Sequence, residues 1–194
     1  MVHLTGILND FLALEKLETG MIEVMTKEFD LVTFSEELIE EMQLIVKQNQ
    51  HIVYQHTGAF STVYLDPFLL KNAVINLVSN AIKYSGENSF IQFNTEVSDT
   101  EVNITLIDNG IGMPLTEQKN LFIPFFRAHN TENVPGTGLG LNIVKRYVEL
   151  MGGKIMFQST EDIGTSISMI FNSQQKVDKI VQDQKKISIL IEDE

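Results

Sequence analysis

The chain has 194 residues, enough for one globular domain with extensions or for two small ones, and 43% of them are hydrophobic, which suffices for a core. Its formal net charge of -12 argues against a nucleic-acid partner, because such binding depends on neutralising phosphates with Lys and Arg. The absence of cysteine excludes disulfides and thiolate metal sites, and no apolar run reaches the roughly 18 residues needed to span a bilayer.

Two helices are expected in the first 50 residues. Residues 1–17 carry apolar side chains at three- and four-residue spacing, and Gly20 follows as a stop signal. That apolar stripe consists of Leu4, Ile7, Leu8, Phe11 and Leu12. A second helix is expected to begin near Thr33, which stands three residues before Glu36 in a capping-box pattern. Its predicted apolar face consists of Leu38, Met42, Ile45 and Val46.

A long third helix is expected after two strands at 51–55 and 62–65. Asp66 is a suitable N-cap, and Pro67 suits the first helical position. The predicted core face consists of Leu70, Val74, Leu77, Val78 and Ala81. The opposite, polar stripe consists of Asn72, Asn76, Asn80 and Lys83, because residues three and four apart share one side of a helix.

The second half of the chain predicts strands and one more helix. The helix is expected from Thr137 to Met151, because Gly152 and Gly153 follow it as a stop signal. A long loop at 114–135 precedes it. The strands are expected at 89–96, 101–108, 154–160 and 165–171, the last two forming a hairpin around Gly164.

Asn76 and Asn80 stand one helical turn apart, so that their amides point the same way. An amide oxygen can coordinate Mg²⁺ without adding negative charge beside a triphosphate, and Mg²⁺ takes only one or two protein ligands besides water and phosphates. Lys83 lies on the same side and can offset phosphate charge. Alone, this stripe is also typical of a solvated helix surface.

Asp108 ends an apolar strand and is followed by Gly110 and Gly112. Its carboxylate can accept a hydrogen bond from the exocyclic amine of adenine, whereas guanine would present an oxygen there and leave two acceptors facing each other. Glycines let the backbone approach a flat base without a Cβ clash. Taken alone, Asp-Asn-Gly is also a common turn.

Gly136, Gly138 and Gly140 lead into the last predicted helix, whose free amides and positive end suit phosphate binding. This run is not a Walker motif, because no Lys-Ser or Lys-Thr follows the last glycine. A flexible loop is the alternative for the glycines alone. An aromatic cluster at 122–126 is expected to pack in the core, and Arg127 after it is either solvated or a phosphate contact.

Together these clusters resemble the catalytic ATP-binding domain of a sensor histidine kinase, in the GHKL superfamily shared with gyrase, mismatch-repair ATPases and heat-shock chaperones. Residues 66–85 resemble its N box, 108–112 and 136–141 its two glycine boxes, and 122–127 its Phe box. The resemblance covers residues 23–172. It implies an α/β fold of the Bergerat type, a two-layer sandwich with a mixed β-sheet covered on one face by helices.

The resemblance also assigns roles to single residues, with ATP and Mg²⁺ as cofactors. It implies that Asn80 coordinates Mg²⁺ and that Asn76, Lys83 and Arg127 serve catalysis. The residues expected to bind the nucleotide are Asn80, Tyr84, Asp108, Gly110, Gly112, Gly136, Thr137, Gly138, Leu139, Gly140 and Thr165.

The same resemblance divides the chain. Residues 1–20 resemble the second helix of a dimerisation and phosphoacceptor hairpin, 21–172 form the ATP-binding domain, and 173–186 are a polar linker. Residues 187–194 resemble the start of a receiver domain, which implies a hybrid kinase. We find no helix bearing the acceptor His and therefore expect a fragment of a longer protein that does not autophosphorylate by itself.

The implied function is transfer of the γ-phosphoryl of MgATP to a histidine on that separate hairpin, as part of a cytoplasmic two-component system whose membrane anchor, if present, belongs to a sensor region outside this chain. Expected partners are the acceptor hairpin, a response regulator or receiver domain, and a second copy in a full-length homodimer; nucleic acid is not expected. The alternatives are a GHKL-type ATPase, a non-catalytic nucleotide-sensing module and a serine-kinase anti-sigma factor.

Overall fold

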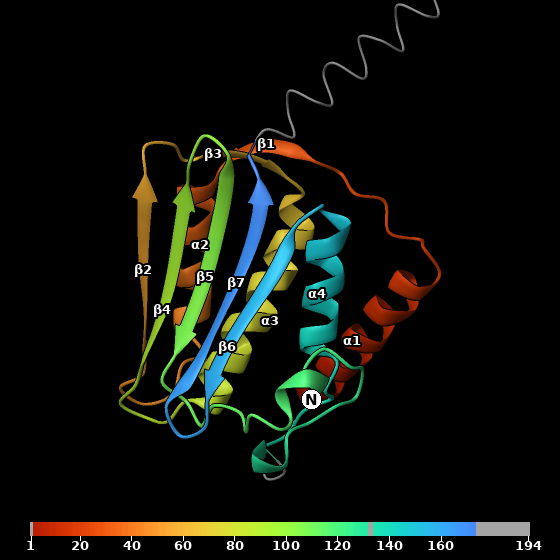
Figure 1. Ribbon diagram of the computed structural model, residues 1–194, viewed down its shortest axis with the longest axis vertical. Coiled ribbons are helices and arrows are strands. Elements are labelled where there is room, and N and C mark those ends of the chain that lie inside the picture. The colour runs from red at the N-terminus through yellow and green to blue at the C-terminus, as the bar shows by residue number, and fades with distance from the viewer. Residues whose placement is uncertain (1, 132–133, 174–194) are drawn as a thin grey trace, which may run out of the picture.

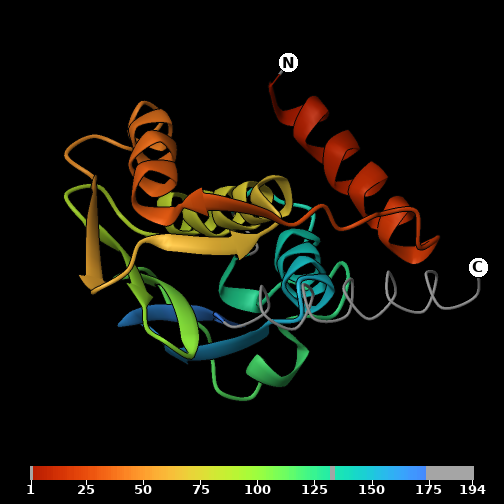
Figure 2. The same cartoon turned by 90° about the horizontal axis from the view of Figure 1, so that it is seen from above.

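A five-stranded sheet with helices on one of its faces forms the body of the molecule (Figures 1 and 2). The computed structural model describes residues 2–131 and 134–173, without the side chains of residues 2–7 and 9. The strand order is β2-β4-β5-β7-β6, with β2 and β4 parallel and the other pairs antiparallel. The strands are β2 (His51–Gly58), β4 (Phe90–Val97), β5 (Glu101–Asp108), β6 (Lys154–Thr160) and β7 (Gly164–Asn172). The expected two-layer α/β sandwich with a mixed sheet is therefore confirmed.

Three helices lie along the covered face, and a fourth stands outside them (Figure 2). The three are α2 (Leu31–Gln43), α3 (Pro67–Tyr84) and α4 (Gly140–Leu150), and the outer one is α1 (Val2–Glu18), which packs mainly on α4. A small antiparallel pair joins β1 (Lys27–Asp30) to β3 (Thr62–Leu65). Two short 3₁₀ helices, η1 (Gln118–Asn120) and η2 (His129–Thr131), lie between β5 and α4. Among all residues that the structure describes, no helix combines the length and the apolar character that crossing a membrane requires.

The core lies between the sheet and the helices. Strand β5 alternates, with Val102, Ile104 and Leu106 buried on the covered face, as the period of two along a strand requires. Leu70 and Leu77 of α3 pack against that face and are almost fully buried. Burial of each such side chain stabilises the fold by about 1.5–3 kcal/mol, and this packing fixes which side of α3 faces outward.

Helix α3 begins as the sequence predicts. The Asp66 carboxylate accepts hydrogen bonds from the backbone N–H groups of Phe68 (2.9 Å) and Leu69 (3.1 Å), which are otherwise unpaired at a helix start. Its second oxygen accepts from the N–H of Met25 at 2.7 Å. One buried side chain thus fixes both the start of α3 and the path of the chain that enters the domain.

Helix α2 starts two residues earlier than predicted. Its N-cap is Asp30, whose carboxylate accepts from the N–H of Thr33 at 2.8 Å, so the Thr33–Glu36 capping box is wrong. The carboxylate forms its cap only because β1 ends at Asp30 in an extended conformation, and β1 itself was not predicted. The helix ends at Gln43, and Ile45, expected on its apolar face, is 61% exposed.

Helix α4 begins at Gly140 rather than at Thr137. Gly138 has a φ of +73°, in the left-handed region, which the first turn of a right-handed helix cannot contain. A Cβ at this position would lie 2.7 Å from the carbonyl carbon of Phe125. The glycine run is therefore a loop that packs on residue 125 before the helix starts.

The apolar stripe predicted for the first helix is not the face that α1 buries. Leu14 is buried and Leu17 packs beside it, whereas Leu8 and Phe11 are 56% and 55% exposed. The inward face of α1 is therefore not the predicted one. The predicted linker at 173–186, apart from Ser173, and the receiver-like residues 187–194 lie outside the described residues.

Candidate nucleotide-binding site

A cavity of about 510 Å³ lies between α3, the start of α4 and the ends of β5 and β7. This volume is in the range of small-molecule sites. Most of the predicted site residues line it, namely Asn76, Asn80, Lys83, Tyr84, Asp108, Gly112, Arg127, Gly136, Thr137, Gly138, Gly140 and Thr165. Two predicted residues do not: Gly110 is absent from the lining, and Leu139 is 2% exposed and belongs to the core.

The asparagine stripe of α3 faces this cavity. The amide nitrogen of Asn76 donates to the carbonyl of Asn72 at 3.0 Å, which fixes its rotamer and leaves its oxygen toward α4. A Cβ at Gly140 would lie 3.0 Å from that oxygen. The amide of Asn80 has no hydrogen-bond partner within the described part of the chain.

These two amide oxygens fit the protein's share of a Mg²⁺ site. Mg²⁺ keeps most of its water and binds substrate phosphates, so one or two neutral oxygen ligands suffice. No group of three or more His, Cys, Asp or Glu among the described residues could hold a metal by itself. A metal here would therefore depend on the nucleotide for its remaining ligands.

Lys83 and Tyr84 end α3 beside the glycine loop. The Lys83 ammonium donates to the Tyr84 hydroxyl at 3.1 Å. A Cβ at Gly136 would lie 2.4 Å from the nitrogen of that ammonium. Lys47, which the sequence analysis missed, donates from Nζ to the carbonyls of Lys83 (2.9 Å) and Ser85 (2.6 Å). A cation at these free carbonyls stabilises the end of the helix and so positions Lys83.

Asp108 lies at the end of β5, paired in register with Thr165 of β7. Its carboxylate accepts a hydrogen bond from the N–H of Gly110 at 2.8 Å. Burial raises the pKa of Asp108 from 3.8 to about 6, against the opposing effect of the N–H groups of Gly110 and Thr165. The group is therefore a partly desolvated acceptor, ionised at neutral pH, on the wall of the cavity.

The glycines after Asp108 serve the protein's own backbone. Gly112 has a φ of +57°, and a Cβ there would lie 1.9 Å from the carbonyl oxygen of Thr160. A Cβ at Gly110 would lie 2.6 Å from the carbonyl oxygen of Tyr84. Close packing of the loop on α3 and β6 is therefore a reason why glycine is needed here, and the predicted approach to a base stays a prediction.

Arg127 lines the cavity and also makes contacts within the protein that the sequence did not predict, while its predicted part in catalysis stays a prediction. Its guanidinium donates to the carbonyl oxygens of Thr131, Val134 and Gly136. We call the described residues of this stretch, 128–131 and 134–136, the lid segment, since they lie between this arginine and the glycine loop. Arg127 gathers the lid segment around its side chain and thereby positions the wall of the cavity.

Replacing Arg127 by Ala is expected to loosen the lid segment. The amides of Thr131 and Val134, which donate to backbone carbonyls inside it, should exchange hydrogen about tenfold faster or more, because three acceptors lose their common donor. Arg127→Lys should not restore protection, since one ammonium cannot replace the planar fork. Exposed Arg146→Ala on α4 is the control. Unchanged exchange in Arg127→Ala would refute this role.

The aromatic cluster is not the core element expected. Phe125 is 62% exposed and has a φ of +65°, while Phe126 lines the cavity. The buried neighbours are Leu121 and Ala128. The N–H of Phe125 donates to the carbonyl of Gly138 at 3.1 Å, which ties this segment to the glycine loop.

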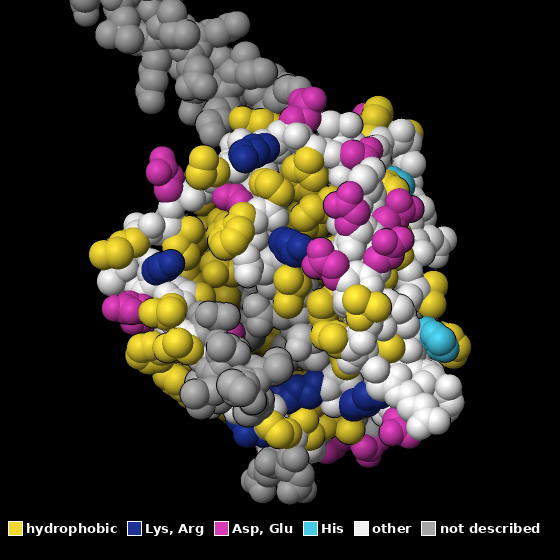
Figure 3. Space-filling view, turned by 180° about the vertical axis from the view of Figure 1, so that it is seen from behind, with side chains coloured by type: hydrophobic (Ala, Val, Ile, Leu, Met, Phe, Trp, Pro, Cys, Tyr) yellow, Lys and Arg dark blue, Asp and Glu magenta, His cyan; other side chains and the backbone are white. Residues whose placement is uncertain are grey.

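Charges around the cavity balance each other. Its lining holds two cations, Lys83 and Arg127, and two carboxylates, Asp108 and Asp10, the last from α1. A group of acidic side chains that contributes to the net charge lies elsewhere, over α2 (Figure 3), where the exposed positions are Glu36, Glu37, Glu40 and Glu41. Asp10 was missed because a single acid in an apolar helix gives no local signal.

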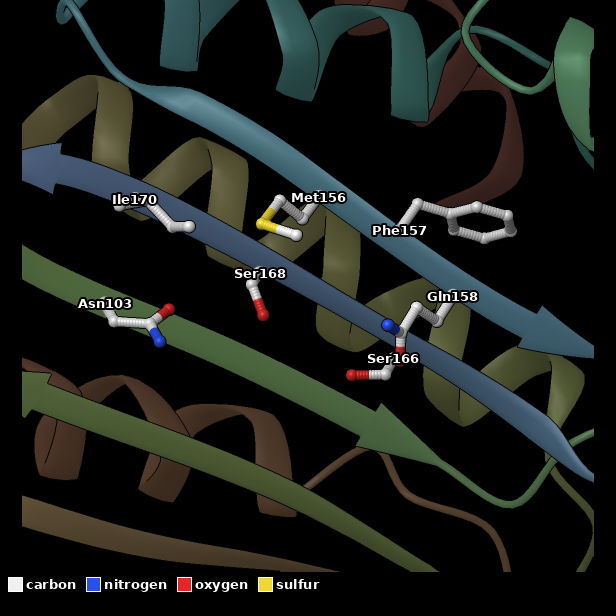
Figure 4. A pocket seen from close by; sticks show the side chains of 7 residues that line it. All are labelled: Asn103, Met156, Phe157, Gln158, Ser166, Ser168 and Ile170. Atoms are coloured by element: carbon white, nitrogen blue, oxygen red, sulfur yellow. The ribbon is translucent and has the colours of Figure 1, made fainter.

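The uncovered face of the sheet also has a smaller hollow, of about 150 Å³ (Figure 4). Its polar side chains are neutral, and none of the predicted site residues belongs to it. They are Asn103, Gln158, Ser166 and Ser168, beside Met156, Phe157 and Ile170. The larger cavity on the helical side is therefore the candidate site.

Comparison with known proteins shows the family of the chain. Residues 65–175 match the family model of the histidine kinase-, DNA gyrase B-, and HSP90-like ATPases, which is more than half of the chain. The chain belongs to this family. Among curated relatives it is 30% identical over 166 residues to the sensor histidine kinase WalK of Bacillus subtilis and 32% over 183 residues to GacS of Pseudomonas protegens.

Those alignments cover 84% and 87% of this chain but 27% and 19% of the two relatives, so the chain spans less than a third of either. The solved catalytic domain of histidine kinase ThkA is 30% identical, with a TM-score of 0.61, 77% of this chain and 98% of that chain being covered. Full-length ShkA in complex with AMPPNP has a TM-score of 0.76 at 23% identity, with 87% of this chain and 35% of that chain covered. At this identity the match shows a similar fold.

The chain is thus homologous to the catalytic domains of sensor histidine kinases. The expectation drawn from the three clusters is confirmed, and the alternative of a GHKL-type ATPase or a sensing module is not favoured.

Proposed function

We propose that this chain binds MgATP in the cavity on α3 and transfers its γ-phosphoryl group to a histidine of a helical hairpin in the same full-length protein. The observation that carries the proposal is the gathering of Asn80, Asp108 and the glycine loop around one cavity. Phosphoryl transfer needs little covalent chemistry from the protein, so positioning and charge neutralisation suffice.

Each part of the cavity has a distinct task in this proposal. The Asp108 carboxylate accepts a hydrogen bond from the adenine amine, and the ammonium of Lys83 lies toward the phosphates. Asn76 and Asn80 would hold Mg²⁺, which neutralises phosphate charge when bound. Arg127 holds the lid segment beside the phosphates of the nucleotide and is a positioning residue.

In the reaction, a nitrogen of the acceptor imidazole forms a bond to the γ-phosphorus. The bond from that phosphorus to the bridging oxygen breaks, ADP leaves, and the imidazole loses a proton. Among the histidines whose side chains are described, His51, His56 and His129 do not line the cavity. The acceptor is therefore expected on the hairpin, whose second helix resembles α1. A response regulator or receiver domain would take the phosphoryl group onward, within a homodimeric kinase.

Transfer to a separate hairpin tests the proposal. The chain is incubated with γ-labelled MgATP, with and without a hairpin that bears the acceptor His of the full-length protein. Label that is stable in base and labile in acid should appear on the hairpin, and it should vanish with labelled GTP or with Asp108→Ala. A His3→Ala chain serves as control, and transfer to the chain itself that requires His3 would contradict the proposal.

A further inference from the structure

The acidic residue that α1 places in the cavity has no task in the proposed reaction. Asp10 accepts a hydrogen bond from the Thr137 hydroxyl at 3.0 Å, and the same hydroxyl oxygen accepts from the N–H of Leu139 at 3.2 Å. Thr137 stands between the glycines of the loop that precedes α4. The contact therefore joins the outer helix to the part of the cavity proposed for phosphates.

Asp10 is surrounded by groups that favour a negative charge. It lines the cavity together with Lys83, Gly136 and Thr137, and the Lys83 ammonium acts on its charge. Burial raises the pKa of Asp10, while the Thr137 hydroxyl and Lys83 oppose that shift. The carboxylate thus accepts from one hydroxyl and is favoured by the charge of one cation, and a phosphate group could use both.

We propose that Asp10 is a specificity residue, whose carboxylate competes with the phosphate tail of the nucleotide, so that α1 docked on α4 and a bound triphosphate exclude each other. This inference rests on the proposed function, since it concerns the phosphates of that nucleotide. A triphosphate brings more negative charge to this place than a diphosphate, and adenosine brings none. Repulsion by Asp10 therefore grows with the number of phosphates.

Helix α1 can yield to such competition. It packs mainly on α4 with Leu14 as its buried side chain, while its Leu8, Phe11 and Leu12 remain exposed. Gly20 follows it with a φ of +67°. By reciprocity, a ligand that binds better when α1 is away also moves α1 away, and a docked α1 lowers the affinity for that ligand by the same factor.

Binding of adenosine, ADP and ATP in Mg²⁺ by calorimetry tests the competition, with wild type, Asp10→Asn and Glu15→Gln. Glu15→Gln removes one charge from the exposed side of the same helix. Asp10→Asn should bind ATP about tenfold more tightly, ADP less so, and adenosine as wild type does. An unchanged or lower ATP affinity, or an equal gain for adenosine, would overturn the inference.

A second measurement follows α1 itself. The chain has no cysteine, so spin labels can be attached at Glu18→Cys on α1 and Arg146→Cys on α4. ATP should lengthen the distance between the labels in the otherwise unchanged chain but not in Asp10→Asn. A fixed distance in both would refute the competition while leaving ATP binding intact. Failure of every variant to bind ATP would instead refute the proposed function and this inference with it.

Discussion

Asp108→Asn is expected to stabilise the ligand-free protein at neutral pH and, in the same variant, to weaken ATP binding. Burial makes the ionised carboxylate costly, so that the pKa of Asp108 is about 6 in the folded chain instead of 3.8. That difference corresponds to about 3 kcal/mol of unfolding free energy once the group is ionised in both states. An amide avoids this cost, and we expect a gain of about 1–3 kcal/mol.

The pH dependence has a definite sign. The folded state holds the Asp108 proton more tightly than the unfolded state, so the cost is absent below pH 3.8, grows up to pH 6 and is complete above it. Urea unfolding from pH 4 to pH 8 should therefore give unfolding free energies for wild type and Asp108→Asn that are similar at the acid end and differ by pH 7. The exposed Asp99→Asn variant should match wild type throughout.

ATP binding should change in the opposite direction. The carboxylate offers two acceptor oxygens, whereas the amide offers one oxygen and an NH₂ donor, so either the adenine amine or the Gly110 N–H would face the amide nitrogen. One donor is left facing another, and we expect an affinity loss of about 10- to 100-fold at pH 7.5. A variant that is more stable and yet binds ATP as wild type does would remove Asp108 from the adenine site.

The predictable parts of this protein are those with local causes. Asp66-Pro67 fixes the start of α3, and the periodicity of α3 then determines which side carries Asn76 and Asn80. Strands β3, β5 and β6 have the predicted bounds because turn residues flank alternating side chains. The order of the three clusters was sufficient to predict the family and the cavity they share.

The parts that were missed depend on contacts between distant segments. Strand β1 forms only by pairing with β3, and Asp30 caps α2 because that pairing holds it extended. Lys47 reaches the end of α3 across 36 residues, and Asp10 meets Thr137 across 127. Neither contact has a pattern in the neighbouring sequence, so tertiary packing alone reveals them.

Asn80→Ala is expected to weaken ATP binding about 100-fold in Mg²⁺ but less than about threefold in EDTA, because the lost amide oxygen serves the nucleotide only through the metal. Asn72→Ala is the matched control on the same stripe, since Asn72 lies eight residues before Asn80, about 12 Å along the helix axis. It should change affinity little in either buffer. Calorimetry of each variant with and without Mg²⁺ gives the four affinities needed.

Asn80→Asp separates ligation from charge. The carboxylate keeps an oxygen at the same place, so the dependence on Mg²⁺ should persist, whereas affinity in EDTA should fall below that of Asn80→Ala because the added charge repels the phosphates directly. If Asn80→Ala loses the same factor with and without metal, Asn80 contacts the nucleotide itself, and the metal ligand must be sought at Asn76, whose oxygen lies toward Gly140.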